Sequence, residues 1–177
     1  QPTAETSRDT LVALSSALRR HTGYGTQRIG LVTRPQTPII AARSEDVLIL
    51  TAELNGVMGL EDVRKAFVEE IETAARQSLP FEALADALLR RDEFFDTTGL
   101  VKTLLDVRPP LQFMESVTYG APIRSLVEPP ARRDAELVVT VSRVSKDRLR
   151  IGFGFDPQKH DRKQIARFAD DLVIALA

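Results

Sequence analysis

Side chains that could act as nucleophiles, general bases or metal ligands are scarce in this sequence of 177 residues. It contains two histidines and no cysteine, which excludes disulfides, thiolate catalysis and cysteine-rich zinc sites. His21 lies at the end of an expected helix, where a cation complements the helix dipole, and His160 lies just before another. Neither has a second ligand at metal-binding spacing, so we interpret both as surface or capping residues.

The other sequence motifs also do not form a complete active site. No G-x-S-x-G nucleophile elbow is present, and the glycine pairs at 23–25 and 152–154 lack a phosphate-binding fingerprint. The second pair predicts a strand whose backbone is closely approached by a neighbour. The carboxylate cluster is Glu69, Glu70 and Glu72, and Arg76 lies one turn beyond Glu72, which indicates a solvated, ion-paired helix face. The residue types alone therefore describe a unit without its own catalyst.

Charge and hydropathy exclude further classes of partner. Lys and Arg number 24 and Asp and Glu 25, a net charge of -1 that gives no electrostatic footprint for nucleic acid. No apolar run reaches the roughly 20 residues of a membrane helix, and the N-terminus lacks the apolar stretch of a signal peptide. The chain begins with Gln1 rather than Met, so we expect a segment processed or excised from a longer cytoplasmic protein.

Helices are expected where apolar residues recur at helical spacing or where a helix-start signal is present. The expected helices are 7–20, 60–77, a shorter one at 81–90 that directly follows Pro80, and 161–176. In the last of these, Asp161 and Gln164 have the spacing of a capping box.

Strands are expected at 28–34, 47–54, 101–108, 136–142 and 148–155. The second is a continuous apolar run, which is typical of a strand covered on both faces. The last two alternate and predict an antiparallel hairpin, whereas 109–134 is irregular with a short strand near 111–114. The predicted fold class is α/β, with a mixed, partly antiparallel sheet flanked by helices. We expect one domain over 1–177, with residues 1–6 as a linker.

One segment resembles a known family. Residues 76–89, RQSLPFEALADALL, end an amphipathic helix and continue beyond it. They are similar to the motif of nonribosomal peptide synthetase condensation domains in which a helix ends in a polar pair and is followed by x-Pro-Phe-Glu and a short helix. Gln77, Pro80, Phe81 and Glu82 stand at the matching positions. Pro80 and Glu82 also suit a helix start on structural grounds alone.

Other pieces follow in the family's order. Residues 17–34 look like the helix, Thr-Gly turn and strand that open the family's C-terminal lobe. Residues 90–108 are similar to its next motif, an Arg-containing loop before a strand, with Arg91 and Asp92 at matching positions. The final hairpin and helix resemble the end of that lobe.

The chain also departs from the family pattern. Thr98-Gly99 stands where the family has Asn-Pro, and residues 35–54 lack its Gly-x-Phe-Val-Asn motif and Leu-Arg strand. The catalytic H-H-x-x-x-D-G motif, which in the family belongs to the N-terminal lobe, is absent.

The resemblance implies a chloramphenicol-acetyltransferase-like lobe, the C-terminal subdomain of a condensation domain. In the family, two lobes enclose a tunnel in which two carrier-bound thioesters meet, and a motif histidine helps the acceptor amine attack the donor thioester. This chain would form one wall of that tunnel, as part of an amide-forming acyltransferase that is inactive alone. Its expected partners are an N-terminal lobe and peptidyl or acyl carrier proteins, which carry the phosphopantetheine. The chain itself is expected to bind no cofactor and no metal.

The resemblance gives six candidates for a substrate or structural role, and no catalytic residue. They are Gln77, Pro80, Phe81, Glu82, Arg91 and Asp92. Helix breaking, core packing or a loop-anchoring ion pair explains each of them equally well. Two other functions stay open: a non-catalytic docking module for a carrier protein or synthetase domain, and a lobe of a CoA-dependent acyltransferase.

Overall fold

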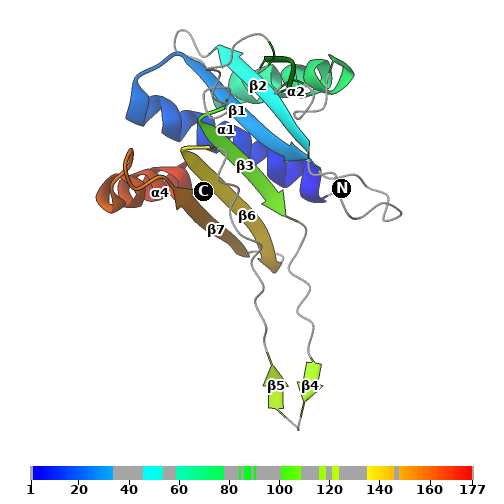
Figure 1. Cartoon of the computed structure of the whole chain (residues 1–177), viewed down its shortest axis with the longest axis vertical. Coiled ribbons are helices and arrows are strands. Elements are labelled where there is room, and N and C mark those ends of the chain that lie inside the picture. Colours follow the sequence, from blue (N-terminus) through cyan, green and yellow to red (C-terminus); the bar gives the residue numbers. More distant parts are fainter. Residues whose placement is uncertain are drawn as a thin grey trace.

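The protein is described by a computed structural model, in which residues 2–33, 46–53, 59–77, 84, 86–88, 90, 101–108, 116–118, 121–123, 135–145 and 148–176 are placed. In chain order the elements are α1 (Pro2–Thr22), β1 (Thr26–Thr33), β2 (Asp46–Glu53), α2 (Leu60–Gln77), β3 (Thr103–Arg108), β4 (Ser116–Thr118), β5 (Ala121–Ile123), β6 (Leu137–Ser145), β7 (Arg148–Phe155) and α4 (Arg162–Leu176) (Figure 1). Among these residues, no helix is both long enough and apolar enough to cross a membrane.

The main sheet has five strands in the order β2-β1-β3-β6-β7. The three central strands run parallel, while β2 and β7 are antiparallel edge strands. The predicted hairpin 136–155 is the β6–β7 pair, with a bulge between Arg143 and Ser145. The expected mixed, partly antiparallel sheet flanked by helices is therefore confirmed.

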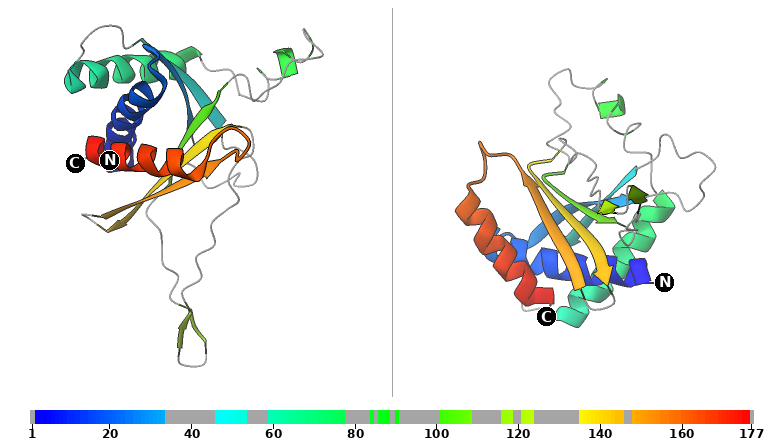
Figure 2. Two further views of the ribbon diagram at one scale, coloured as in Figure 1. Left: turned by 90° about the vertical axis from the view of Figure 1, so that its left-hand side faces the viewer. Right: turned by 90° about the horizontal axis from the view of Figure 1, so that it is seen from below.

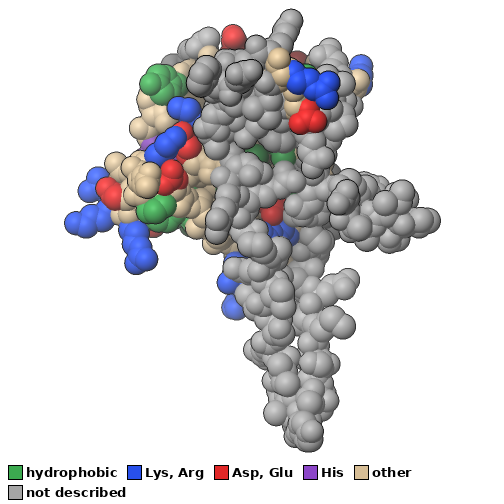
Figure 3. Space-filling view, in the orientation of Figure 1, with side chains coloured by type: hydrophobic (Ala, Val, Ile, Leu, Met, Phe, Trp, Pro, Cys, Tyr) green, Lys and Arg blue, Asp and Glu red, His purple; other side chains and the backbone are tan. Residues whose placement is uncertain are grey.

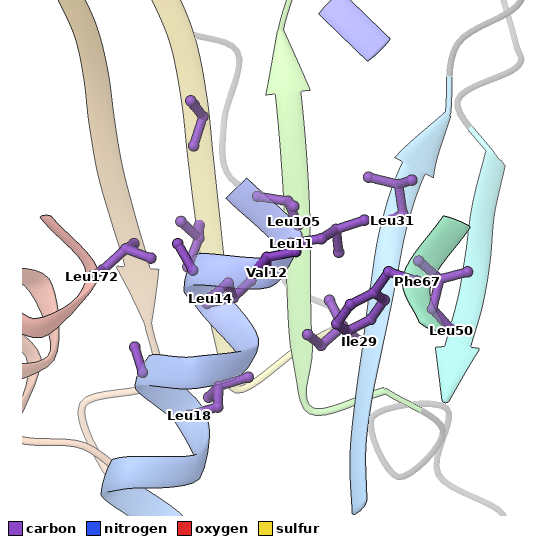
Figure 4. Packing of buried hydrophobic residues seen from close by; sticks show 14 of the residues in the cluster. Leu11, Val12, Leu14, Leu18, Ile29, Leu31, Leu50, Phe67, Leu105 and Leu172 are labelled. Carbon is purple, nitrogen blue, oxygen red and sulfur yellow. The ribbon is translucent and has the colours of Figure 1, made fainter. Parts of the chain in front are cut away.

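Helices α1, α2 and α4 all cover one face of this sheet, so these described elements form two layers (Figure 2). We call this side the helix face and the opposite side the second face. On the helix face, Leu11 and Leu14 of α1, Phe67 of α2 and Leu172 of α4 are fully buried and point toward strand residues such as Leu105 (Figure 4). Burying one such side chain contributes about 1.5–3 kcal/mol. The helical spacing in the sequence thus specifies the core.

The start of α1 corrects one expectation. Residues 1–6 were expected to be a linker, but α1 begins at Pro2 and Thr6 is 9% exposed. Proline is favoured in the first helical turn, because its missing N–H would be unpaired there and its φ angle is already helical. The carbonyl of Thr6 accepts a hydrogen bond from Thr10 Oγ1, and its hydroxyl accepts one from Arg143 of β6. The N-terminal turn is therefore tied to the sheet.

The predicted cap of α4 is present. The backbone N–H of Gln164 donates to Asp161 Oδ1 at 2.8 Å, and the N–H of Asp161 donates to Gln164 Oε1 at 3.3 Å. These reciprocal bonds satisfy two donors at the start of the helix. The capping box therefore fixes where α4 begins.

The second face of the sheet has its own apolar cluster. Val32, Val47, Val101, Leu104 and Val138 are buried there, with Ile49 and Ala135 packed against them. Strand β2 thus contributes Val47 to this cluster and Leu50 to the helix-face core, which confirms that it is covered on both faces. Its position at the sheet edge was not predicted.

The expectations for residues 81–90 and 109–134 can be compared with the structure only in part. The two-stranded sheet β4–β5 was not predicted, because strands of three residues are too short to show a pattern. The strand expected near 111–114 lies outside the described residues. Of the expected helix 81–90, residues 84 and 86–88 are helical, and the N–H of Arg90 donates to the carbonyl of Asp86 at 3.1 Å.

Candidate functional site

Most residues selected from the sequence cannot be placed in the structure. Gln77 is the last residue of α2, so the helix does end at the polar pair that the sequence suggested. Pro80, Phe81, Glu82, Arg91 and Asp92 lie outside the described residues. A substrate or structural role for these six residues stays a prediction.

The two histidines lie at different places, His21 in the helix layer and His160 in the turn between β7 and α4. His21 Nε2 lies 2.8 Å from Asp171 Oδ2, and the His21 ring meets Phe168 edge-on at 5.3 Å, so this side chain joins α1 to α4. The backbone N–H of His160 donates to the carbonyl of Asp156 in the turn before α4. Within the described part of the chain, no group of His, Asp or Glu side chains could hold a metal ion. These contacts give His21 a structural role in packing.

Polar side chains gather on the second face, in two rows that cross three strands. Directly opposite residues of neighbouring strands project from the same face. One row is Asp106, Thr140 and Gly152 of β3, β6 and β7. The next row is Arg108, Ser142 and Arg150. The view in Figure 1 is onto this face, and Figure 3 shows an acidic and a basic side chain together where β3 ends.

Asp106 and Arg108 form an ion pair within β3. Arg108 Nε donates to Asp106 Oδ2 at 2.9 Å. The Arg108 side chain is 17% exposed and the Asp106 side chain is 10% exposed. Removing one partner from such a pair leaves a buried charge uncompensated, which is strongly destabilising. The pair therefore holds the Arg108 guanidinium in a fixed position on the second face.

Gly152 lets the neighbouring Thr140 hydroxyl lie against the β7 backbone. Thr140 Oγ1 donates to the carbonyl of Gly152 at 3.3 Å, and a Cβ at Gly152 would lie 2.6 Å from that oxygen. This confirms that the glycine on this strand marks a close approach to the backbone.

The two rows lie near the carboxyl ends of β3 and β6, the second pair of parallel strands in the sheet. In open α/β sheets, ligands commonly bind outside the carboxyl ends of parallel strands. The Arg108 guanidinium and the Ser142 hydroxyl are groups that can donate hydrogen bonds to a ligand oxygen, whereas the Thr140 hydroxyl already donates its hydrogen to Gly152. We refer to Asp106, Arg108, Thr140, Ser142 and Arg150 as the polar rows.

The sequence reasoning did not select the polar rows. The available signal was the pattern TLLDVR at 103–108, in which two charged residues alternate with apolar ones in a buried central strand. Their alignment with β6 could not be read from the sequence, because parallel register depends on tertiary pairing.

Several solved structures have the same fold. The starter condensation domain of rhizomide synthetase RzmA aligns with 98% of this chain and 41% of its own, at 20% identity and a TM-score of 0.74. The condensation domain of the Monacolin K polyketide synthase MokA aligns with 96% of this chain and 40% of its own, at 19% identity and a TM-score of 0.65. The epimerization domain of the third module of tyrocidine synthetase B aligns with 96% of this chain and 40% of its own, at 15% identity and a TM-score of 0.62.

These likenesses establish the fold and its extent. The chain has the fold of part of a condensation domain and spans about two fifths of the length of the proteins it matches. No family model matches the sequence, and no curated protein matches it by sequence. Because condensation and epimerization domains share the fold, the fold alone does not choose the reaction.

Proposed function

We propose that this chain is the C-terminal subdomain of a nonribosomal peptide synthetase condensation domain. It forms one wall of the tunnel in which a carrier-bound acyl or peptidyl thioester is joined to an amine acceptor. The alignment of 98% of the chain with 41% of a starter condensation domain, at a TM-score of 0.74, carries this proposal. The order of the sequence motifs at 17–34, 76–89 and 90–108 supports the choice of the C-terminal lobe.

The role of this lobe is to position substrates, and the catalyst comes from its partner. The 177 residues contain no His-His pair, and His21 is committed to the α1–α4 contact. The resemblance assigns the attack of the acceptor amine to a histidine of the N-terminal lobe. Holding two reactants in the right geometry supplies a large part of the rate in such reactions. A sheet braced on one face by three helices is a rigid support for that purpose.

The proposed partners follow from this role. They are an N-terminal condensation lobe, in the same or a separate chain, and peptidyl or acyl carrier proteins whose phosphopantetheine arms enter the tunnel. The matching structures support partner domains in general, since they are domains of larger synthetases.

Two observations test the assignment. The reading frame upstream of Gln1 should encode an H-H-x-x-x-D-G motif, and a start codon directly before Gln1 would instead require a separately encoded N-terminal lobe. A separately produced N-terminal lobe should bind this chain in analytical ultracentrifugation. Absence of binding to both a cognate N-terminal lobe and loaded carrier proteins would contradict the proposal.

A further inference from the structure

The two edge strands of the main sheet differ in how their outer backbone groups are used. On β2, the N–H of Thr51 donates to Glu70 Oε1 of α2 at 3.2 Å, so a side chain closes part of that edge. On β7, no described strand or side chain pairs with the outer backbone groups. Exposed edges can pair with another chain, and proteins commonly blunt them. Within the described residues, β7 is therefore the open edge of the sheet.

The hydrogen bonds around β6 show which residues of β7 face outward. The N–H of Asp156 donates to the carbonyl of Glu136 at 2.9 Å, so this pair points inward. The N–H of Leu137 donates away from β7, to the carbonyl of Lys102 at 3.0 Å. Because the two kinds of pair alternate along an antiparallel ladder, every second residue of β7 directs its N–H and carbonyl to the open side. These residues are Leu149, Ile151, Phe153 and Phe155.

The outward residues are spaced symmetrically about Gly152, so two copies of β7 can pair with each other. With an antiparallel pairing and a two-fold axis at Gly152, Leu149 lies opposite Phe155 of the second copy. Ile151 then lies opposite Phe153, and all four outward residues are hydrogen-bonded between the copies. The two glycines meet at the axis in a pair of the closer kind, where larger side chains would crowd each other.

The same register is electrostatically self-complementary. It places Arg148 of each copy opposite Asp156 of the other, once at each end of the paired strands. Arg148 is exposed, and neither its guanidinium nor Asp156 Oδ2 bonds to a described residue. Arg150 lies opposite Gly154, so the pairing does not depend on its charge. Opposite charges directly across a strand pair are stabilising and like charges are destabilising, which favours this register.

Helix α4 leaves room for a second copy beside β7. It packs against this strand, since Phe168 meets Phe153 edge-on at 6.1 Å, and it lies on the side of β7 away from β6 (Figure 1). Asp171 contacts His21 and so faces α1. Successive helix residues turn by about 100°, so Ala166 and Ala169 lie roughly 140–160° around α4 from Asp171. The side of α4 turned away from α1 therefore carries short side chains, which another helix can approach.

We propose that β7 is a dimerisation edge, which pairs with β7 of a second copy of this chain about a two-fold axis at Gly152. The open outer backbone, the symmetric spacing of the outward residues and the match of Arg148 with Asp156 support this pairing. An interface built on one strand pair belongs to the class below about 1,200 Å², which is typical of weak complexes, so the dimer should dissociate on dilution. The pairing is independent of the proposed function.

Analytical ultracentrifugation of the full chain over a range of concentrations tests the pairing, and the wild type should show a monomer–dimer equilibrium. Arg148→Asp and Asp156→Lys each place like charges opposite each other and should each weaken the dimer about tenfold or more. An equimolar mixture of the two variants should dimerise again, because the heterodimer has opposite charges at both ends. Arg76→Asp on α2, where the side chain is 79% exposed, is the matched control and should leave association unchanged.

A backbone variant tests the same edge without a change of charge. Leu149→Pro removes an outward N–H that the β6–β7 ladder does not use, and it should also weaken the dimer. Circular dichroism checks the fold of each variant. Because Arg148 is exposed, Arg148→Asp decides the outcome if Asp156→Lys or Leu149→Pro does not fold.

Three results would overturn the dimer. They are a wild type that is monomeric at every concentration, a dimer that Arg148→Asp leaves intact, and a mixture of the two folded charge variants that stays monomeric. A monomeric chain that binds a separately produced N-terminal lobe, with that binding weakened by Leu149→Pro, would assign the edge to that lobe instead. A monomeric chain would leave the proposed function unaffected.

Discussion

Gly30 tests the packing of the second face, because its lack of a side chain makes room for three neighbours. It lies in β1, paired with Ile49 of β2 and Leu104 of β3. A Cβ at this position would lie 2.5 Å from Leu104 Cδ2 and 2.9 Å from Cγ1 of both Val101 and Val47. Gly30→Ala therefore forces the apolar cluster on this face to move.

The expected cost follows from two opposing effects. Overpacking a close-packed site costs about 1–3 kcal/mol. The loss of backbone freedom in the unfolded chain returns about 0.5–1 kcal/mol. All three contacts of the added Cβ would be shorter than 3.0 Å, so we take the upper part of the overpacking range, about 2–3 kcal/mol. The free energy of unfolding should therefore fall by about 1–2.5 kcal/mol, which in a chain of this size lowers Tm by roughly 2–10 °C.

Urea denaturation followed by circular dichroism measures this cost and its origin. The midpoint should fall while the slope m stays unchanged, because the surface exposed on unfolding is nearly the same. Leu104→Ala alone should cost about 2–5 kcal/mol. In the Leu104→Ala background, Gly30→Ala should cost at least about 1 kcal/mol less, because residues in contact couple in double-mutant cycles. A neutral Gly30→Ala, or an equal cost in both backgrounds, would refute this account of the packing.

Further predictions concern the helix layer. Leu172→Ala should lower the free energy of unfolding by about 2–5 kcal/mol in urea denaturation, whereas Val173→Ala, at a 56% exposed neighbour, should change it by less than about 0.5 kcal/mol. Equal losses would contradict the observed orientation of α4. Asp161→Ala should cost about 0.5–2 kcal/mol in the same assay, because it removes the cap of α4, and Asp161→Asn should retain most of the stability. An equal loss of stability in Asp161→Ala and Asp161→Asn would contradict a capping role for Asp161. Asp171→Ala should cost at most about 1 kcal/mol, since its contacts with Arg20 and His21 are partly exposed and screened. The cost should fall in high salt, and a larger, salt-independent cost would contradict a screened contact.

Much of the fold could be predicted because its elements are amphipathic and well delimited. Helix α2 was expected at 60–77 and lies at Leu60–Gln77, because its apolar spacing and its first-turn acids agree. The β6–β7 hairpin followed from alternation, and α4 followed from its capping box. In these segments local and tertiary preferences coincide.

The remaining features depend on tertiary pairing, which leaves little trace in local sequence. The helical turn before Thr6 carries no apolar stripe, and its placement depends on a bond from Arg143 of a distant strand. The polar rows exist only because β3 and β6 pair in parallel with Asp106 beside Thr140. Conversely, the site residues suggested by resemblance rest on motif spacing, and five of the six lie outside the described residues.

Amide formation from loaded carrier proteins tests the central claim most directly. The measurement compares this chain alone, an N-terminal lobe alone that carries H-H-x-x-x-D-G, and the two together, with product detected by mass spectrometry. The proposed function predicts product only when both are present, and loss of product when the second motif histidine of the partner is replaced by alanine. Turnover by this chain alone, or full turnover by the N-terminal lobe without it, would contradict the claim.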